Sequence, residues 1–354
     1  MKNPYTGVID RYRPFLQLDQ GVQAISLLEG DTPLIPLNRI AKNIGRGIKL
    51  WVKFEGLNPT GSFKDRGMTA AVSEAAQRGA DTVICASTGN TAASAAAYAA
   101  RAGMRAIVLI PAGKVASGKL AGAFAYGAEV IQIDGSFDDA LDIVVKISQK
   151  HPIALVNSLN PFRLEGQKTA AFEICDVLGR APDWLALPVG NAGNITAYWM
   201  GFRQYHDSHG FGLPRVLGVQ AEGAAPLVLG KPVEQPETIA TAIRIGKPAR
   251  GEEALTAAAE SNGRIIAVSD EDILSAQRWL ASEGIWVEPA SAAGLAGLIQ
   301  QMRVNDLDFR DREIVIVCTG HGLKDPDTVT RAFGKPKKYP ADISALEKMI
   351  LNDG

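Results

Sequence analysis

Residues 82–111, TVICASTGNTAASAAAYAARAGMRAIVLIP, decide the fold of this chain. The two ends of the stretch, 82–86 and 105–111, are short apolar runs bounded by polar residues, a pattern that favours buried strands. Between them, residues 91–102 are mostly alanine and predict a helix with a face small enough to lie close to a sheet or a ligand. A strand, a helix and a second strand in this order predict parallel strands joined by a crossover helix.

The alternation of strands and helices extends from this stretch in both directions. Before it, residues 48–54 predict a strand and residues 63–78 a helix, in which Ser62 and Asp65 are expected to form a capping box. After it, we expect one helix that follows residue 111 and ends at about residue 126, and a second helix over 137–150. We expect strands over 128–134, 152–157, 184–189, 215–221, 265–269, 285–287 and 313–318. This order predicts an α/β fold with parallel sheets covered by helices on both faces.

The length of 354 residues corresponds to about two domains at ~150 residues each. The chain contains no internal repeat and no low-complexity linker that would mark a boundary. Residues 223–263 are rich in Gly, Pro and Ala and predict irregular structure with short helices. We assign residues 55–155 to a smaller α/β domain, and residues 1–54 together with 156–354 to a larger one.

The composition excludes several classes of protein. Lys and Arg number 37 and Asp and Glu 38, whereas nucleic-acid-binding proteins usually carry a basic excess. The three cysteines, an odd number, rule out a fully paired disulfide framework within the chain, and no Cys-x-x-Cys or His-x-x-x-His pair suggests a metal site. No apolar run suits a signal peptide or a membrane span, so we expect a cytoplasmic protein without membrane or nucleic-acid partners.

The first candidate for chemistry is Lys64, which follows a predicted strand. Ligands bind at the carboxyl ends of parallel strands, and the segment Asn58–Gly67 lies at such an end. In the first turn of a helix, the helix dipole disfavours an ammonium and so favours a neutral amine, which can act as a nucleophile or a base. The alternatives are that Lys64 is solvated and that Asp65 and Arg66 form a local ion pair.

Two further clusters combine small polar residues with a helix N-terminus. Ser87-Thr88-Gly89-Asn90-Thr91 offers hydroxyls, an amide and free N–H groups, which suit a carboxylate or a phosphate. Gly190-Asn191-Ala192-Gly193-Asn194 offers small residues that let backbone N–H groups converge on a phosphate. It lacks the lysine of a Walker loop and the complete Gly-x-Gly-x-x-Gly pattern of dinucleotide-binding folds. For each cluster, an ordinary capped helix or turn is the alternative.

The segment after the strand at 152–157 adds an arginine. Asn160 and Pro161 are expected to be the N-cap and the first residue of a helix, which puts Arg163 in the first turn. A fixed positive charge there calls for an anion, and the guanidinium group is well shaped to bind phosphate. Asn157 and Ser158 lie just before it. A surface salt bridge between Arg163 and Glu165 is the alternative.

The last cluster, Cys318-Thr319-Gly320-His321-Gly322, follows the final predicted strand. The hydroxyl of Thr319 could form one hydrogen bond to a planar ligand. His321 is a conceivable general base, but no partner that would orient it is visible, so we expect it to be structural. Glu288-Pro289-Ala290-Ser291 is interpreted as a similar turn that begins a helix.

Together these clusters resemble the pyridoxal-phosphate enzymes of the tryptophan-synthase-β fold type, fold type II, and within them the threonine synthases. The resemblance covers most of the chain and is carried by Gly61-Ser62-Phe63-Lys64-Asp65-Arg66, Ser87-Thr88-Gly89-Asn90-Thr91 and Val189-Gly190-Asn191-Ala192-Gly193-Asn194. Related dehydratases usually carry three or four glycines at the last of these positions. The resemblance implies two open, twisted, mostly parallel sheets flanked by helices, with the active site between the domains, and usually a homodimer.

The resemblance also implies roles for single residues. Lys64 would bind the cofactor pyridoxal 5′-phosphate covalently and then move protons. Asn90 would hydrogen-bond the phenolic oxygen of the cofactor ring, and Thr319 its pyridine nitrogen. The cofactor phosphate would be bound by Gly190, Asn191, Ala192, Gly193 and Asn194. The substrate carboxylate would be bound by Ser87, Thr88 and Thr91. The substrate phosphate would be bound by Asn157, Ser158 and Arg163.

The implied activity is that of a lyase, which converts O-phospho-L-homoserine and water to L-threonine and phosphate by γ-elimination and β-hydration. Two alternatives stay open at this point. A threonine or serine dehydratase of the same fold has no phosphate on its substrate and would not need Arg163. A non-catalytic amino-acid-binding module would not need Lys64.

Overall fold

The structure, a computed structural model, describes residues 4–112, 117–328 and 338–352. Its strands form two sheets, in the orders β1-β2-β10-β7-β8-β9 and β5-β4-β3-β6. All neighbouring strands run parallel except β1 and β2. The strands are β1 (Leu34–Pro36), β2 (Lys49–Phe54), β3 (Thr82–Ala86), β4 (Arg105–Pro111), β5 (Glu129–Ile133), β6 (Ala154–Leu155), β7 (Trp184–Pro188), β8 (Arg215–Ala221), β9 (Arg264–Val268) and β10 (Glu313–Cys318).

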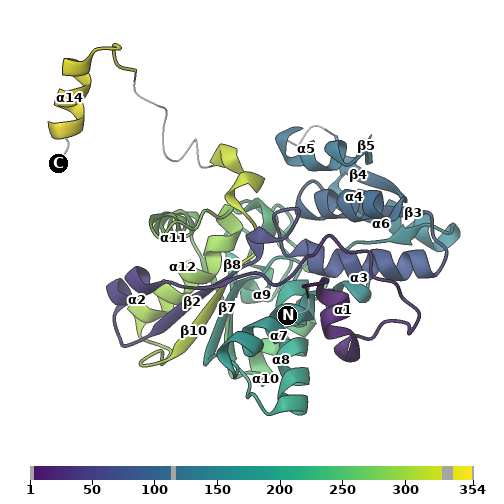
Figure 1. Cartoon of the computed structure of the whole chain (residues 1–354), viewed down its shortest axis with the longest axis horizontal. Coiled ribbons are helices and arrows are strands. Elements are labelled where there is room, and N and C mark those ends of the chain that lie inside the picture. The colour runs from purple at the N-terminus through teal and green to yellow at the C-terminus, as the bar shows by residue number, and fades with distance from the viewer. Residues whose placement is uncertain (1–3, 113–116, 329–337, 353–354) are drawn as a thin grey trace.

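Helices flank both sheets (Figure 1). The α-helices are α1 (Val8–Tyr12), α2 (Asn38–Ile44), α3 (Lys64–Gln77), α4 (Asn90–Ala102), α5 (Ser117–Ala125), α6 (Phe137–Lys150), α7 (Phe162–Leu178), α8 (Gly193–His209), α9 (Pro226–Leu229), α10 (Gly251–Glu260), α11 (Asp270–Ser282), α12 (Pro289–Val304) and α14 (Ile343–Asn352). The short 3-10 helices are η1 (Arg13–Phe15), η2 (Glu55–Leu57), η3 (Thr241–Ile243) and η4 (Gly322–Lys324). The predicted fold class, α/β with two mostly parallel sheets between helices, is confirmed.

Both faces of the larger sheet are buried, which explains why its strands are continuous apolar runs. Along β10, Ile314 and Ile316 belong to the core beneath α11 and α12. The alternate residues Val315 and Val317 belong to the core beneath α7 and α8. In the smaller sheet, the alanines of α4 pack on β3 and β4, as their small size predicted. None of the described helices combines the length and the apolarity needed to cross a membrane.

Two local predictions are wrong. Residues 285–287 do not form a strand: Val287 makes a single antiparallel bridge to His321, and Pro289 begins α12 two residues later. Ser62 does not cap α3, whose N-cap is Phe63. The backbone of Ser62 instead bridges to Gly320, and the carboxylate that would complete the capping box, Asp65, is bonded elsewhere.

Helices α3 and α7 approach each other closely because each presents a glycine to the other. A Cβ atom on Gly67 would lie 2.7 Å from the carbonyl oxygen of Arg163, and a Cβ on Gly166 would lie 1.7 Å from that of Arg66. Neither distance leaves room for a side chain. The two glycines therefore bring the beginning of α3, which carries Lys64, next to the beginning of α7, which carries Arg163.

Candidate active site

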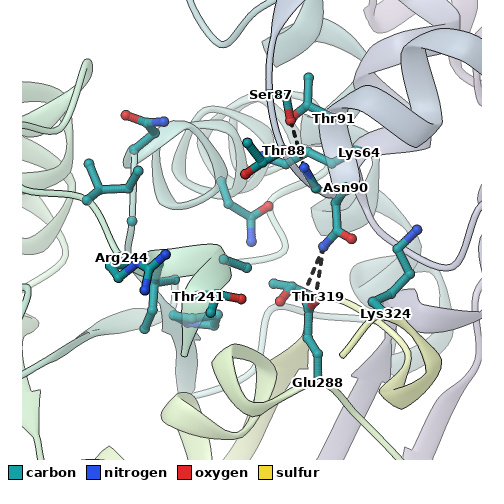
Figure 2. A pocket seen from close by; sticks show the side chains of 18 of the residues that line it. Lys64, Ser87, Thr88, Asn90, Thr91, Thr241, Arg244, Glu288, Thr319 and Lys324 are labelled. Carbon is teal, nitrogen blue, oxygen red and sulfur yellow. Dashed lines mark hydrogen bonds between the residues drawn. The ribbon is translucent and has the colours of Figure 1, made fainter. Parts of the chain in front are cut away.

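A cavity of about 910 Å³ opens where carboxyl ends of strands from both sheets face each other. Its wall includes residues that follow β3, β7 and β10, as expected for a parallel α/β fold (Figure 2). All fourteen residues singled out from the sequence line it: Lys64, Ser87, Thr88, Asn90, Thr91, Asn157, Ser158, Arg163, Gly190, Asn191, Ala192, Gly193, Asn194 and Thr319. The structure therefore brings together segments more than 250 positions apart in the chain, such as Lys64 and Thr319.

The loop before Lys64 is pinned to the loop that follows β10. The amide of Phe63 donates to the carbonyl of Thr319 at 3.0 Å, and the amide of His321 donates to the carbonyl of Gly61 at 2.9 Å. Gly61 has φ +83°, a backbone conformation that favours glycine. The two loops therefore hold Lys64 and Thr319 in a fixed relation to each other.

Asp65 fastens the same loop from the other side. Its carboxylate accepts hydrogen bonds from the amide and the hydroxyl of Thr60, both at 2.6 Å, and from the hydroxyl of Ser94 at 2.6 Å. Burial raises the pKa of Asp65 to about 6, although these hydrogen bonds lower it. Asp65 and Arg66 thus do not form the local ion pair considered above, because each has partners of its own.

Lys64 is the first residue of α3, and its amine is poised for chemistry. Its pKa is lowered to about 7, chiefly by burial and also by the nearby positive charge of Arg163, while Glu288 opposes the shift. The Nζ atom lies 4.4 Å from the centre of the Phe63 ring. Within the part of the chain that the structure describes, Lys64 forms no ion pair. A substantial fraction of Lys64 is therefore a neutral, nucleophilic amine near neutral pH.

The N-terminus of α4 presents hydroxyls and an amide to the cavity. The Oγ atom of Ser87 accepts hydrogen bonds from the amides of Gly89 and Ala92, each at 3.2 Å, so this side chain also caps the helix. Among the described residues, the hydroxyls of Thr88 and Thr91 have no hydrogen-bond partner. The amide of Asn90 donates to Glu288 at 3.0 and 3.2 Å (Figure 2).

The N-terminus of α8 forms an anion-binding nest. Ala192 has φ +64°, the left-handed conformation that turns successive backbone N–H groups toward one point. A Cβ on Gly190 would lie 3.0 Å from the Cα of Ile243, so a side chain at this position would crowd the backbone of η3. The Nδ2 atom of Asn194 is buried and has no partner among the described residues. An orphaned donor beside free helical N–H groups fits a bound phosphate.

Arg163 is not the surface residue of the alternative interpretation. It is only 1% exposed, and its Nη1 atom donates to the carbonyl of Val156 at 2.8 Å. Glu165, its expected partner, pairs with Lys168 instead. Burial lowers the pKa of Arg163 to about 10. In the described part of the chain, the Nε atom of Arg163 has no hydrogen-bond partner and its guanidinium group pairs with no carboxylate.

The neighbours of Arg163 differ from expectation in detail. Helix α7 begins at Phe162, one residue later than predicted, and the side chain of Asn160 accepts a hydrogen bond from the Phe162 amide at 2.9 Å. The Asn157 amide is bonded through both its atoms to the backbone of Ala86, at 3.0 and 2.9 Å. One N–H of Asn157 remains for a ligand, while the rest of the group ties this wall to the end of β3.

Thr319 is 5% exposed, and its hydroxyl lies 2.9 Å from that of Ser291 on α12. His321 does not line the cavity. Its ring stacks on Phe54, contacts Trp286 edge-on, and accepts a hydrogen bond from the amide of Leu323. These contacts match the structural role expected for His321, whose pKa is lowered by burial.

One wall of the cavity was not predicted from the sequence. Thr241 and Arg244 come from the segment predicted to be irregular, and Lys324 comes from η4 (Figure 2). The Nζ atom of Lys324 donates to the carbonyl of Thr60 at 3.0 Å. The Nη1 atom of Arg244 lies 3.7 Å from the Oε2 atom of Glu237. No regular pattern marks these residues in the sequence. Glu288 had a signal, the Glu-Pro-Ala-Ser turn, but the interpretation was limited to a helix start.

Comparison with known proteins identifies relatives of this chain. Residues 25–320 match the family described as pyridoxal-phosphate dependent enzyme. A threonine synthase of Synechocystis sp. is 58% identical over 94% of this chain and 87% of its own length. A threonine synthase of Halalkalibacterium halodurans is 58% identical over 97% of this chain and 96% of its own length. Maize serine racemase, a solved structure 21% identical, covers 93% of this chain and 97% of its own, with a TM-score of 0.75.

Proposed function

The chain belongs to the threonine synthase family of pyridoxal-phosphate-dependent enzymes, and from this premise we propose how its cavity performs the reaction. The reaction is the conversion of O-phospho-L-homoserine and water into L-threonine and phosphate. The observation that carries the proposal is that Lys64, which has no ion pair in the described structure, lines the same cavity as an anion nest and the buried Arg163. The amine, the nest and the arginine together suit a substrate that carries a phosphate in addition to that of the cofactor.

The residues present fit pyridoxal 5′-phosphate. The nest at the start of α8, with the orphaned amide of Asn194, accepts its phosphate. Asn90 and Thr319 each offer one polar group to its ring, and Lys64 provides the amine that binds it covalently. When bound, the cofactor supplies an electron-accepting ring, which stabilises negative charge at the substrate Cα.

The remaining groups suit the two anionic ends of the substrate. Ser87, Thr88 and Thr91 offer hydroxyls and helix N–H groups to its carboxylate. Ser158 and Arg163, with the free N–H of Asn157, bind its phosphate. A dehydratase acting on serine or threonine has no such phosphate, and a buried Arg163 without a carboxylate partner would then have nothing to neutralise it. This favours the threonine synthase reaction over the dehydratase alternative.

Lys64 performs the proton transfers. The amine of Lys64 would remove the Cα proton of the bound substrate. It would next remove a proton from Cβ as phosphate leaves Cγ, and would then return a proton to Cγ. After water adds at Cβ, it would return a proton to Cα, which completes threonine. A flexible side chain with a pKa near 7 suits these successive transfers, because it releases and accepts protons with little cost near neutral pH. The released phosphate, held by Ser158 and Arg163, is the base proposed for activating the water.

Product analysis tests this function. The holoenzyme is supplied separately with O-phospho-L-homoserine and with threonine, and the products are quantified by chromatography. We expect threonine and phosphate in equal amounts from the first substrate. Ammonia and an oxo acid from threonine, without turnover of phosphohomoserine, would support the dehydratase instead. Absence of both reactions, together with no visible absorption after addition of the cofactor, would support a non-catalytic binding module.

We further propose that the enzyme is a cytoplasmic homodimer. The support is the resemblance to its fold type, for which homodimers are usual. In addition, Cys85, Cys175 and Cys318 are all buried and unpaired, as is common in a reducing compartment. Sedimentation equilibrium should give twice the mass of one chain, and the mass of a single chain would contradict the dimer.

A further inference from the structure

We propose that the beginning of α12 positions the two residues that hold the cofactor ring: Glu288 positions Asn90, and Ser291 positions Thr319. The proposal rests on the proposed function, which assigns Asn90 and Thr319 to the ring. Neither Glu288 nor Ser291 is assigned a role in that function. They are positioning residues, since each acts through the side chain that it contacts.

The first contact joins the N-cap of α12 to the first residue of α4, and both residues line the cavity. Glu288 is 5% exposed, and its two carboxylate oxygens lie 3.0 and 3.2 Å from the Nδ2 atom of Asn90 (Figure 2). An ionised carboxylate only accepts hydrogen bonds, so the amide of Asn90 must turn its NH₂ group toward Glu288. This fixes which face of the amide remains for a ligand, a choice that an isolated asparagine would leave open.

The backbone that carries this carboxylate is held on both sides. The amide of Glu288 donates to the carbonyl of Gly320 at 3.1 Å, and its carbonyl accepts from the amide of Ser291 at 3.0 Å. A Cβ on Gly320 would lie 2.5 Å from a carboxylate oxygen of Glu288, so this oxygen rests directly against the backbone. Pro289 at the first helical position further restricts the turn. Glu288 is therefore a fixed acceptor.

The second contact lies one turn further along α12. The hydroxyl of Ser291 is 2.9 Å from that of Thr319 and accepts a hydrogen bond from the amide of Gly320 at 2.8 Å. Ser291 is 1% exposed, so water does not compete for these bonds. Its hydroxyl, which also donates to the carbonyl of Gly320 at 3.2 Å, orients the side chain of Thr319 and leaves the other hydrogen-bonding positions of the Thr319 hydroxyl for a ligand.

The two contacts have a joint consequence. Glu288 and Ser291 are three residues apart at one helix end, so a single rigid element sets the position of Asn90 relative to Thr319. Groups that must meet opposite sides of one flat ring need such a shared support, because a displacement of about 1 Å can cost about 100-fold in rate. The beginning of α12, which the sequence predicts only as a turn, therefore positions two side chains of the cavity.

A double-mutant cycle tests the link between Glu288 and Asn90. The variants are Glu288→Ala, Asn90→Ala, the double variant, and Glu288→Gln, which keeps an oxygen that can accept the bond from Asn90. Glu271→Gln, on the exposed surface of α11, is the matched control for loss of one carboxylate. The measurements are kcat, the visible circular dichroism of the bound cofactor, the affinity of the apoenzyme for the cofactor, and thermal unfolding.

We expect Glu288→Ala to lower kcat about 10- to 100-fold and to reduce the circular dichroism of the cofactor. The same change should have less than about a twofold effect in the Asn90→Ala background, since a residue that acts through Asn90 has nothing left to position. Glu288→Gln should restore most of both signals. Ser291→Ala should likewise reduce the dichroism, by releasing Thr319.

Three outcomes would overturn the proposal: independent, multiplicative losses in the double variant, a Glu288→Gln variant as impaired as Glu288→Ala, or unchanged dichroism in Glu288→Ala. If a variant unfolds, the Gln variant and the cofactor affinity still decide the matter. The proposed function fails separately, namely when the wild-type enzyme and Glu271→Gln do not make threonine. The dichroism of the bound cofactor remains informative in that case.

Discussion

Arg66 and Arg163 lie on the two helices that pack through Gly67 and Gly166, and each is only 1% exposed, yet their surroundings differ completely. Arg66 is surrounded by carboxylates: its guanidinium contacts Glu55 and Glu173, each at 2.6 Å. The amine of Lys53 also pairs with Glu173 at 2.6 Å. Arg163 has a backbone carbonyl and, within the described residues, no carboxylate partner at all.

The two regions use buried charge for different purposes. In the network of Lys53, Glu55, Arg66 and Glu173, two positive and two negative side chains balance each other. Burial alone would raise the pKa of Glu173, but Arg66 and Lys53 outweigh it and hold this pKa well below its ordinary value. Such a network belongs to the folded protein and leaves no charge for a ligand. At the cavity, neither Lys64 nor Arg163 forms an ion pair with a carboxylate within the described part of the chain, so an arriving anion would supply the missing negative charge.

The largest effect is expected from Lys64→Ala. In the proposed mechanism Lys64 is both the covalent attachment and the proton carrier, so turnover should fall by about 10⁴-fold or more, which is about 5.4 kcal/mol at 1.36 kcal/mol per factor of ten. The visible absorption of the lysine-bound cofactor should vanish. The free energy of unfolding at pH 7 should stay level or rise, because Lys64 has no ion pair to lose within the described structure and its desolvated amine is replaced by an apolar side chain. Retained turnover and retained absorption would contradict the assignment.

Arg66→Met addresses the paired region. It leaves two buried carboxylates without their guanidinium, and breaking a buried ion pair from one side costs about 3–5 kcal/mol of the free energy of unfolding. Denaturant unfolding measures the change. Arg310→Ala, at an exposed position, is the control and should stay within about 0.5 kcal/mol of the wild type. A loss of less than about 1 kcal/mol in Arg66→Met would mean that the network is not structural.

Arg163→Met should show the opposite pattern. Loss of the proposed phosphate-binding group should lower kcat/KM for O-phospho-L-homoserine by about 100-fold, or about 2.7 kcal/mol in the transition state. The free energy of unfolding should stay level or rise, because a desolvated charge without a carboxylate partner is replaced by an apolar side chain. Steady-state kinetics and denaturant unfolding are measured on the same preparation. Unchanged kinetics would remove Arg163 from the substrate site.

The sequence predicts well which residues line the cavity. Lys64, the nest at Gly190–Asn194 and Thr319 were found because polar residues directly after apolar strands must meet at one edge of a parallel sheet. The strand and helix order follows from the same alternation. Local patterns therefore suffice wherever a functional residue lies next to the strand that carries it.

The paired network could not be predicted in the same way. Arg66 and Glu173 are 107 positions apart, and nothing in either neighbourhood marks them as partners. From the sequence, Asp65 was the obvious partner of Arg66, but it turns back to Thr60. Glu288 and Lys324 were missed for a similar reason, since their approach to the cavity depends on how loops fold over it. The division at residues 55 and 155 stays a prediction.

The smallest effect, and the most direct measure of the uncompensated charge, is the titration of Lys64. Its pKa of about 7 lies below that of an ordinary lysine because of burial first and Arg163 second. Arg163→Met should therefore raise this pKa, and Glu288→Gln should lower it, each by on the order of one unit or about 1.4 kcal/mol. Competitive acetylation of the apoenzyme across pH, read by mass spectrometry on the peptide of Lys64, gives the value.

The sign of the stability effect follows from the same shift. Between pH 7 and the ordinary pKa of lysine near 10.5, the unfolded chain binds a proton at Lys64 that the folded chain does not. The contribution of Lys64 to the free energy of unfolding must therefore increase as the pH rises through this range. Lys64→Met should remove that increase, while Lys42→Met, at an exposed position, should leave it intact. An identical pH dependence in the wild type and in Lys64→Met would show that the amine is compensated in the folded protein, as Arg66 is.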